Sequence, residues 1–419
     1  MQVNRKIRIL YILFTGILFH QCDIKKSDIA NEQSFVHVYN DFDFNNEYYP
    51  LDIAETDDGF LILSTKMLNS DSTNFDWNYH YPFVIKTDTR GEVEWTYTGD
   101  NPYVSPIADI LAIDGHYYFF AQHNTGLSPT LFEIDLASQS FSTVSSGNYG
   151  SNSYALKAIA DKEKNILLLV SEKQGTKDSR VYKISGSSFD VTWSSAFTNS
   201  ANDGTSIIIP AVLEQLSHHG RQYPYFIKEV TGSNGNIEYY LAGCYNNTQL
   251  SLNKISYNGN SNSNVISGSR NSVIIATCQQ VNDSVLAIAK NDNSEISLQV
   301  DFPFGQDTKT GIEDINGTVM FREVDGNSLI LSDIVTFHDK KYMIYAAATK
   351  GKQVALFIYN TNDYTIKNIH YLGSTNDIKP VSVKQTTDDA ILVLCKTLVT
   401  NKYPRIALYK VPIKNIGLE

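Results

Sequence analysis

Few residues in this sequence have the types and spacing that catalysis or metal binding requires. His218 and His219 form the one adjacent histidine pair. Neighbouring side chains on a strand point to opposite faces, and no third ligand follows at zinc-site spacing. We therefore expect two polar residues that end a helix or loop, and no metal site. The motifs of nucleophile elbows, HExxH metalloproteases and phosphate-binding loops are absent from the sequence.

Two acidic segments could in principle bind a cation or exchange protons. The run from Asp41 to Glu47 (DFDFNNE) alternates oxygen-bearing side chains, but it lacks the sixth-position glycine and the distal acid of a calcium loop. The pairs Asp57-Asp58 and Asp388-Asp389 occupy the same position in a repeated turn. We interpret all of them as connection or turn residues, and predict no catalytic residue, metal or cofactor.

An aromatic loop is the strongest candidate for binding. Lys66 to Pro82 reads KMLNSDSTNFDWNYHYP and combines flat rings with amide and carboxylate groups, which suits a sugar or a protein hot spot. The alternative is a loop that packs on itself, with its tryptophan covering the edge of a sheet. The candidate binding residues are Phe75, Asp76, Trp77, Asn78, Tyr79, His80 and Tyr81.

The elements that must position this loop are repeated β-strands. Seven times the chain shows a strand, a tight turn and a strongly apolar strand, at a spacing of about 50 to 56 residues with one gap near 70. Such turn residues tolerate positive φ angles. The turns are Asp57-Asp58-Gly59, Asp114-Gly115, Lys164-Asn165, Asn234-Gly235-Asn236, Asn282-Asp283, Asp339-Lys340 and Asp388-Asp389.

These repeats predict an all-β fold, a seven-bladed β-propeller over residues 35–415. A third β-rich run and usually a fourth follow each apolar strand, and four antiparallel strands per repeat are typical of a blade. The apolar strand is covered on both faces by neighbouring blades. The last unit, Asp377 to Ile413, has only three strands. We therefore expect the lone strand Phe35 to Asn40 to complete it and close the ring.

The first unit resembles a known family of repeats. The runs TDDGFLILS and PFVIKTDTRGEVEWTYTG, within Thr56 to Gly99, resemble the repeat of Bacteroidetes-type β-propeller lipoproteins and, loosely, the quinoprotein-like (PQQ-like) propeller repeat. Weaker copies are TWSSAF and TTDDAILVL. The resemblance implies the fold, with Trp95 and Trp193 packing between blades, and it implies no single function. The Asp-box repeats of sialidases are absent, and the tryptophan-bearing repeat of quinoprotein dehydrogenases has one good copy.

The N-terminus has the pattern of an export signal. A basic stretch precedes an apolar run from Ile9 to Phe19, which is too short to span a bilayer as a helix. Cys22, the first cysteine, follows at once, although Gln21 is larger than the residue usually found before a lipidated cysteine. We expect residues 1–21 to be a signal peptide and residues 22–34 a lipidated cysteine and tether. An ordinary signal peptide and an uncleaved anchor are the alternatives.

The remaining sequence adds two expectations about local structure. Cys244, Cys278 and Cys395 lie in apolar strand-like runs and should be buried thiols, with a disulfide between two of them left open. Thr205 to Tyr225 is extra sequence in the fourth unit. Its Pro210 and Gly220 suit a short helix, and a long strand is the alternative. We favour an insertion packed on one face of the ring.

Composition narrows the classes of function. The chain of 419 residues has a formal net charge of −11 and no basic cluster outside its N-terminus, which argues against nucleic-acid binding. We expect a non-enzymatic lipoprotein of the outer membrane that binds an outer-membrane transporter, an assembly complex or a glycan. A carbohydrate-active propeller enzyme is the alternative. Acids or histidines converging on one mouth of the channel would favour the enzyme, and a wide aromatic or apolar patch would favour binding.

Overall fold

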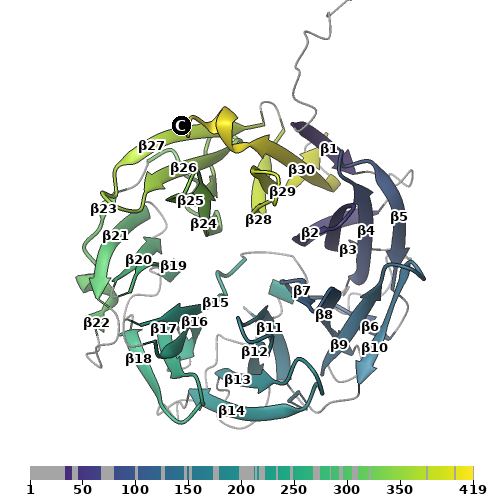
Figure 1. Ribbon diagram of the computed structural model, residues 1–419, viewed down its shortest axis with the longest axis horizontal. Helices are drawn as coiled ribbons and strands as arrows, with labels where there is room; N and C mark the ends of the chain where they lie inside the picture. Colours follow the sequence, from purple (N-terminus) through teal and green to yellow (C-terminus); the bar gives the residue numbers. More distant parts are fainter. Residues whose placement is uncertain are drawn as a thin grey trace, which may run out of the picture. The chain divides into compact units, whose positions relative to one another are not determined.

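The protein is an all-β propeller of seven sheets around a central axis. Figure 1 shows a computed structural model in which, in six sheets, the first strand faces the centre and the later strands lie progressively outward. In the seventh sheet the earliest strand of the chain is the outermost. The structure describes residues 34–418, except 40–45, 68–79, 100–101, 124–127, 146–148, 151–152, 173–178, 198–211, 213–214, 217–221, 233–234, 246–248, 268–273, 284, 292–295, 304–309, 320–321, 374–375 and 401–402. The predicted seven-bladed propeller is confirmed.

The first three blades follow in chain order from residue 47, with antiparallel neighbours in each. Blade 1 comprises β2 (Glu47–Thr56), β3 (Gly59–Met67), β4 (Tyr81–Asp88) and β5 (Val93–Thr98). Blade 2 comprises β6 (Tyr103–Val104), β7 (Leu111–Ile113), β8 (His116–His123), β9 (Pro129–Asp135) and β10 (Ser140–Ser145). Blade 3 comprises β11 (Ser153–Ala160), β12 (Ile166–Glu172), β13 (Ser179–Ile184) and β14 (Val191–Phe197).

Blades 4 and 5 contain the irregular connections of the ring. Blade 4 comprises β15 (Ile227–Thr231), β16 (Ile237–Tyr245), β17 (Gln249–Ser256) and β18 (Asn262–Ser267), with β22 (Thr310–Gly311) parallel to β18. Blade 5 comprises β19 (Ile274–Asn282), β20 (Val285–Asn291), β21 (Ile296–Pro303) and the short β23 (Thr318–Val319). The 3-10 turn η1 (Ile312–Asp314) lies between β22 and β23.

Blade 7 combines the two ends of the propeller sequence. Blade 6 comprises β24 (Ile330–Phe337), β25 (Lys340–Ala348), β26 (Val354–Asn360) and β27 (Ile366–Leu372). Blade 7 comprises β28 (Ile378–Gln385), β29 (Ala390–Val399), β30 (Tyr403–Pro412) and β1 (Phe35–Tyr39), and the 3-10 turn η2 (Ile413–Ile416) follows β30. β1 pairs antiparallel with β30, from Phe35 opposite Lys410 to Tyr39 opposite Ile406.

The seven predicted turns join the first and second strands of the blades. Several turn residues have left-handed backbones, with φ of 52° at Asp114, 65° at Lys164, 61° at Asp339 and 58° at Asp389. The second strands are the most apolar because neighbouring blades cover both of their faces. In β12, for example, every residue from Ile166 to Val170 is fully buried. The turn and strand predictions are confirmed.

A buried lysine and an acid near the first turn recur in four blades. The lysine stands on the third strand and is at most 9% exposed, and its ammonium lies within ion-pair distance of the acid across the sheet. The distances are 2.8 Å for Lys86–Asp58, 3.1 Å for Lys183–Asp161, 3.4 Å for Lys254–Glu238 and 2.6 Å for Lys410–Asp388. Asp58 and Asp388 are therefore turn residues, as predicted, that also pair with the third strand.

Side chains at the ends of inner strands join neighbouring blades. Gln385 of blade 7 accepts a hydrogen bond from the backbone of Thr336 in blade 6 at 2.9 Å and donates to the same backbone at 2.7 Å. Glu55 of blade 1 accepts from Thr387 of blade 7 at 2.9 Å. Gln280 of blade 5 contacts Thr231 of blade 4 in the same manner. Each bond uses a backbone group that the sheets leave unpaired.

Two tryptophans lie at junctions between blades, and two cysteines are buried free thiols. Trp193 of β14 donates its indole N–H to the Tyr257 carbonyl of blade 4 at 3.2 Å, so it packs between blades as the resemblance implied. Trp95 is partly buried against the core that blades 1 and 2 share. Cys278 and Cys395 are buried free thiols, and burial raises the pKa of the Cys278 thiol to about 12. Cys244 lies in β16.

We expect a protein that starts at Asp41, and so lacks β1, to melt several degrees below one that starts at Ser34. Loss of β1 would expose the edge of β30. It would also remove the hydrogen bond, 3.0 Å long, from the Tyr39 hydroxyl to the Gly91 carbonyl of blade 1. Thermal melts of the two purified proteins measure the difference. Equal melting temperatures would contradict the expectation that this strand closes the ring.

Candidate functional site

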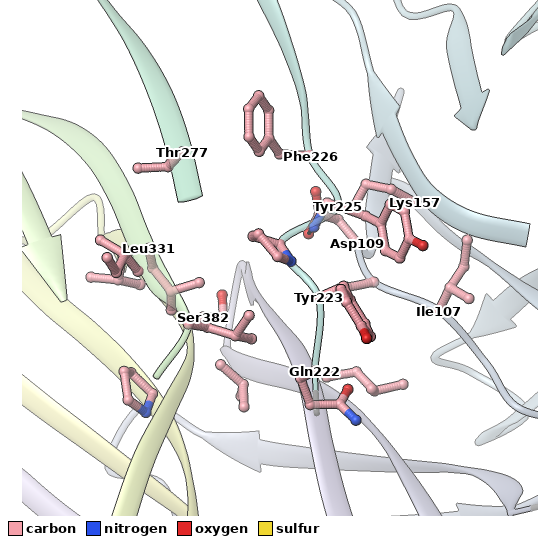
Figure 2. A pocket seen from close by; sticks show the side chains of 18 of the residues that line it. Ile107, Asp109, Lys157, Gln222, Tyr223, Tyr225, Phe226, Thr277, Leu331 and Ser382 are labelled. Atoms are coloured by element: carbon pink, nitrogen blue, oxygen red, sulfur yellow. Dashed lines mark hydrogen bonds and ion pairs between the residues drawn. The ribbon is translucent and has the colours of Figure 1, made fainter. Parts of the chain in front are cut away.

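A cavity of about 930 Å³ lies at the centre of the ring, and all seven blades contribute to its wall. Its volume is at the upper end of the range for small-molecule sites. Figure 2 shows side chains from several blades that point into this space. The contributing segments are 49–51, 106–109, 156–157, 226–228, 276–277, 329–333 and 379–385, one from each blade in order.

Irregular inner strands shape this wall. The pairing register of β2, β11, β19 and β28 shifts by one residue at Leu51, Leu156, Ala276 and Val381 respectively, and all four residues line the cavity. Blade 2 is interrupted between β6 and β7 at the same level. An extra residue of this kind bends the strand and redirects the side chains beside it. The residues that follow the four bulges are polar: Asp52, Lys157, Thr277 and Ser382.

The carboxylate of Asp52 connects three blades beside the cavity. Its side chain is 1% exposed. One oxygen accepts from the Ser382 hydroxyl at 2.7 Å, and the other accepts from the Lys384 ammonium at 2.7 Å and the Ile110 backbone N–H at 2.8 Å. Burial disfavours the charged ammonium of Lys384, but Asp52 and Asp109 outweigh it and raise the pKa of this lysine. Lys384 therefore stays protonated at neutral pH.

A second ion pair lies across the blade 2–blade 3 junction. The ammonium of Lys157 lies 2.6 Å from the carboxylate of Asp109. Burial opposes ionisation of Asp109, but the ammonium groups of Lys157, Lys384 and Lys228 hold the pKa of its carboxyl below the usual value. Asp109 is therefore a charged, paired carboxylate at neutral pH, unsuited to the role of a general acid.

Blades 4, 5 and 6 meet around Lys228. Its ammonium donates to the Ser332 carbonyl at 3.3 Å, and the hydroxyls of Thr277 and Ser332 are 2.7 Å apart. No carboxylate lies within ion-pair distance of Lys228 in the described part of the chain. Burial raises the pKa of Asp333, and Lys228 offsets this shift only in part. Lys228 therefore presents a positive charge that the wall does not neutralise by direct contact.

Two further lysines, Lys379 and Lys396 of blade 7, line the cavity beside Tyr49 of blade 1. We call this part of the wall the rim. The ammonium of Lys396 lies 4.4 Å from the centre of the Tyr49 ring, and that ring lies 5.0 Å from the imidazole of His80. Burial and the neighbouring Lys379 lower the pKa of Lys396, while Glu47 and Asp377 oppose the shift.

The cavity has the opposite charge to the protein as a whole. Among the described residues, its wall contains five lysines and two aspartates, a formal net charge of +3, whereas the whole chain carries −11. Asp52, beside the cavity, also pairs with one of these lysines, Lys384. A concave site with low-dielectric walls concentrates such a field. The charged wall residues are Lys157, Lys228, Lys379, Lys384, Lys396, Asp109 and Asp333.

The predicted insertion contributes one side of this wall. Residues 215–216 and 222–225 line the cavity, and the Tyr223 backbone N–H donates to the Gln215 side chain at 2.7 Å. Val212, Gln215 and Leu216 are helical, so the described part of the insertion favours the short helix over the long strand. Figure 2 shows Gln222, Tyr223 and Tyr225 beside this space. His218 and His219 lie outside the described residues.

The structure places only part of the predicted binding loop. Residues 75–79 and Cys22 lie outside the described residues. His80 is fully buried and its ring nitrogen lies 3.1 Å from the Thr65 hydroxyl, while Tyr81 begins β4. Binding by residues 75–81 and lipidation of Cys22 stay predictions. His80 packs on Tyr49, which joins the end of this loop to the cavity wall.

Sequence reasoning missed the cavity lysines. Lys157, Lys228 and Lys384 stand on three different inner strands, far apart in the chain. A signal was present, because each is a charged residue in a largely apolar strand a few residues before one of the repeated turns. Lys157 and Lys228 stand seven and six residues before their turns, whereas Lys384 stands four residues before its turn. Alignment of the repeats on their turns would therefore have grouped only Lys157 with Lys228.

The described residues contain neither a cluster of metal-binding side chains nor a membrane-spanning helix. No group of three or more metal-binding side chains occurs in the described ranges, and the segment Asp41 to Asn45 falls outside them. No helix in those ranges is long and apolar enough to cross a membrane.

No protein-family model and no curated protein matches this sequence. Its fold is similar to that of a manganese-bound oligogalacturonate lyase, at 11% identity and a TM-score of 0.50 over 91% of this chain and 97% of the other. The β-propeller domain of the Trilobed protease from Pyrococcus furiosus aligns at 9% identity and a TM-score of 0.47, over 88% and 97% of the two chains. A Trypanosoma rangeli sialidase aligns at 13% identity and a TM-score of 0.40, over 78% and 57%. At these identities the likeness shows the fold alone.

We expect Asp52→Asn to lower the free energy of unfolding by about 2 kcal/mol. Removing one partner of a fully buried ion pair costs about 3–5 kcal/mol, and the partial exposure of Lys384 reduces that figure. The matched control is Asp190→Asn, which changes an exposed aspartate. Denaturant unfolding of both variants measures the effect. A stability equal to that of the control would contradict the role of Asp52 in joining the blades.

Proposed function

We propose that this protein is a lipid-anchored binding protein of the cell envelope, and that its propeller holds an acidic saccharide in the central cavity. One observation carries the proposal: a cavity of about 930 Å³ whose described lining residues have a formal charge of +3, in a chain whose net charge is −11. The surplus of lysines is local, so it cannot be attributed to the composition of the chain. A wall of this charge favours a ligand with acidic groups.

The neutral part of the wall favours a sugar over a compact anion. Amide and hydroxyl groups from several blades can exchange hydrogen bonds with sugar hydroxyls, and the half-buried ring of Tyr223 offers a flat surface for a sugar face. Arginine, which binds phosphate in a bidentate manner, is absent from the wall in the described part of the chain. The polar neutral wall residues are Gln215, Gln222, Thr277, Asn327, Ser332, Ser382 and Gln385.

The acids of the wall support binding rather than catalysis. A hydrolase of saccharides needs two carboxyl groups on either side of the scissile bond, one of them available as a proton donor. Of the two lining aspartates in the described part of the chain, Asp109 is ion-paired with Lys157. Burial raises the pKa of Asp333, but the described wall offers no second carboxylate outside an ion pair to act with it. No histidine lines the cavity in the described part of the chain. A non-enzymatic binding role is therefore the function that these contacts favour.

The aromatic loop is a proposed second contact for the same ligand. Its residues 75–79 combine rings with amide and carboxylate groups. His80, near the end of the loop, packs on Tyr49, and Tyr49 lines the cavity. A saccharide that extends beyond the cavity on this side would come close to His80, where the loop ends.

We expect isothermal titration calorimetry to detect binding of trigalacturonate at low salt. The neutral trisaccharide galactotriose should bind at least about tenfold more weakly, a difference of about 1.4 kcal/mol, because it lacks the charge that the lysines attract. Raising the salt concentration should weaken binding of the acidic sugar more than that of the neutral one. Equal affinity for both sugars, or no heat with either, would contradict the proposed ligand class.

The proposed anchor rests on the sequence of the N-terminus. A basic stretch, a short apolar run and the first cysteine stand in the order that export and lipidation require. Several acyl chains on Cys22 would hold the protein firmly at a membrane, since a single chain binds only marginally. We propose the outer membrane as that site.

We expect Cys22→Ser to move the protein from the membrane fraction to the soluble fraction. Cys244→Ser, which changes a cysteine within β16, is the matched control and should leave the protein with the membranes. Cell fractionation and mass spectrometry of the N-terminal peptide provide the readout. A Cys22→Ser protein that stays fully membrane-bound, or a wild-type peptide without acyl groups, would show that the anchor is wrong.

A further inference from the structure

Two lysines stand directly opposite each other at the cavity rim. Lys379 of β28 is the cross-strand partner of Lys396 of β29, and both side chains line the cavity. Like charges in this arrangement destabilise a sheet, because the side chains of opposed residues lie close together. Because this repulsion lowers the stability of the sheet, the presence of both lysines indicates a role in function.

The surroundings of this pair leave most of its charge available. Lys379 lies 3.7 Å from Asp325, and these side chains are 43% and 32% exposed, so water screens the contact. The Lys396 ammonium lies over the ring of Tyr49, a contact that positions the charge without neutralising it. Glu47 and Asp377 act on Lys396 from nearby, but neither forms an ion pair with it in the described part of the chain.

We propose that Lys379 and Lys396 form the subsite for a carboxylate of the ligand, with the buried Tyr49 ring positioning the Lys396 ammonium. This assignment rests on the proposed function and names the group that the rim recognises. A carboxylate between the two ammonium groups would accept from both, and it would replace their repulsion by two charge-assisted hydrogen bonds.

The position of the other lysines indicates an elongated ligand with more than one acidic group. Lys384 stands five residues after Lys379 on the same strand, which corresponds to about 16 Å along β28, less the shortening caused by its bulge. Lys228 also lines the cavity, on the inner strand β15 of blade 4. An acidic oligosaccharide can place one carboxylate at the rim and another at the inner level, whereas a monosaccharide cannot.

The test compares Lys379→Gln, Lys396→Gln and the double variant with Lys367→Gln in titrations with trigalacturonate. Lys367 lies on the exposed face of β27 and supplies the same change of charge. Each single rim variant should lose affinity by about tenfold, the double variant by more, and the control variant should bind as the wild type does. Lys396→Arg should retain most of the affinity because it keeps the charge.

Stability separates recognition from a structural role. Because Lys396→Gln removes a repulsion, its melting temperature should equal or exceed that of the wild type. A lower melting temperature together with lost affinity would overturn the subsite, since the lysine would then support the sheet. Unchanged affinity in the double variant would also overturn it, while the proposed function would stand. Absence of trigalacturonate binding by the wild type would overturn both.

Discussion

The buried carboxylate of Asp52 is the interaction on which the centre of the ring depends. It accepts hydrogen bonds from Ser382 and Lys384 of blade 7 and from the backbone of Ile110 in blade 2, while it belongs to blade 1. A charge with so little exposure is stable only when its oxygens are satisfied, so the three blades must keep their relative positions at this level. The inner strands are irregular here, so some of their regular hydrogen bonds are missing. The bonds of Asp52 hold the neighbouring strands together at this level.

The bulges of the inner strands place polar side chains at the cavity or beside it. A regular inner strand would alternate its side chains, whereas the shift at Leu51, Leu156, Ala276 and Val381 redirects the following polar residue. Some charges of the wall neutralise one another, as Lys157 does with Asp109. The surplus of lysines is what distinguishes the cavity from the acidic chain around it.

The fold could be predicted from the sequence because its signals are local. Each turn pairs with an apolar strand within a few residues, and the turn at Asp114 and Gly115 adopts the positive φ values that these residue types favour. The cavity could not be predicted in the same way, because Lys157, Lys228 and Lys384 are brought together only by ring geometry. The insertion was recognised as extra sequence, yet its sequence did not show that Tyr223 would line the cavity.

Anomalous diffraction from crystals soaked in selenate would test the central claim, that the middle of this acidic protein is an anion site, most directly. Selenate scatters anomalously and binds where cationic groups converge. The strongest selenium peak is predicted within the cavity, between the ammonium groups of Lys379 and Lys396, with further density near Lys228. Peaks confined to lysines on the outer surface, with none in the cavity, would contradict the claim.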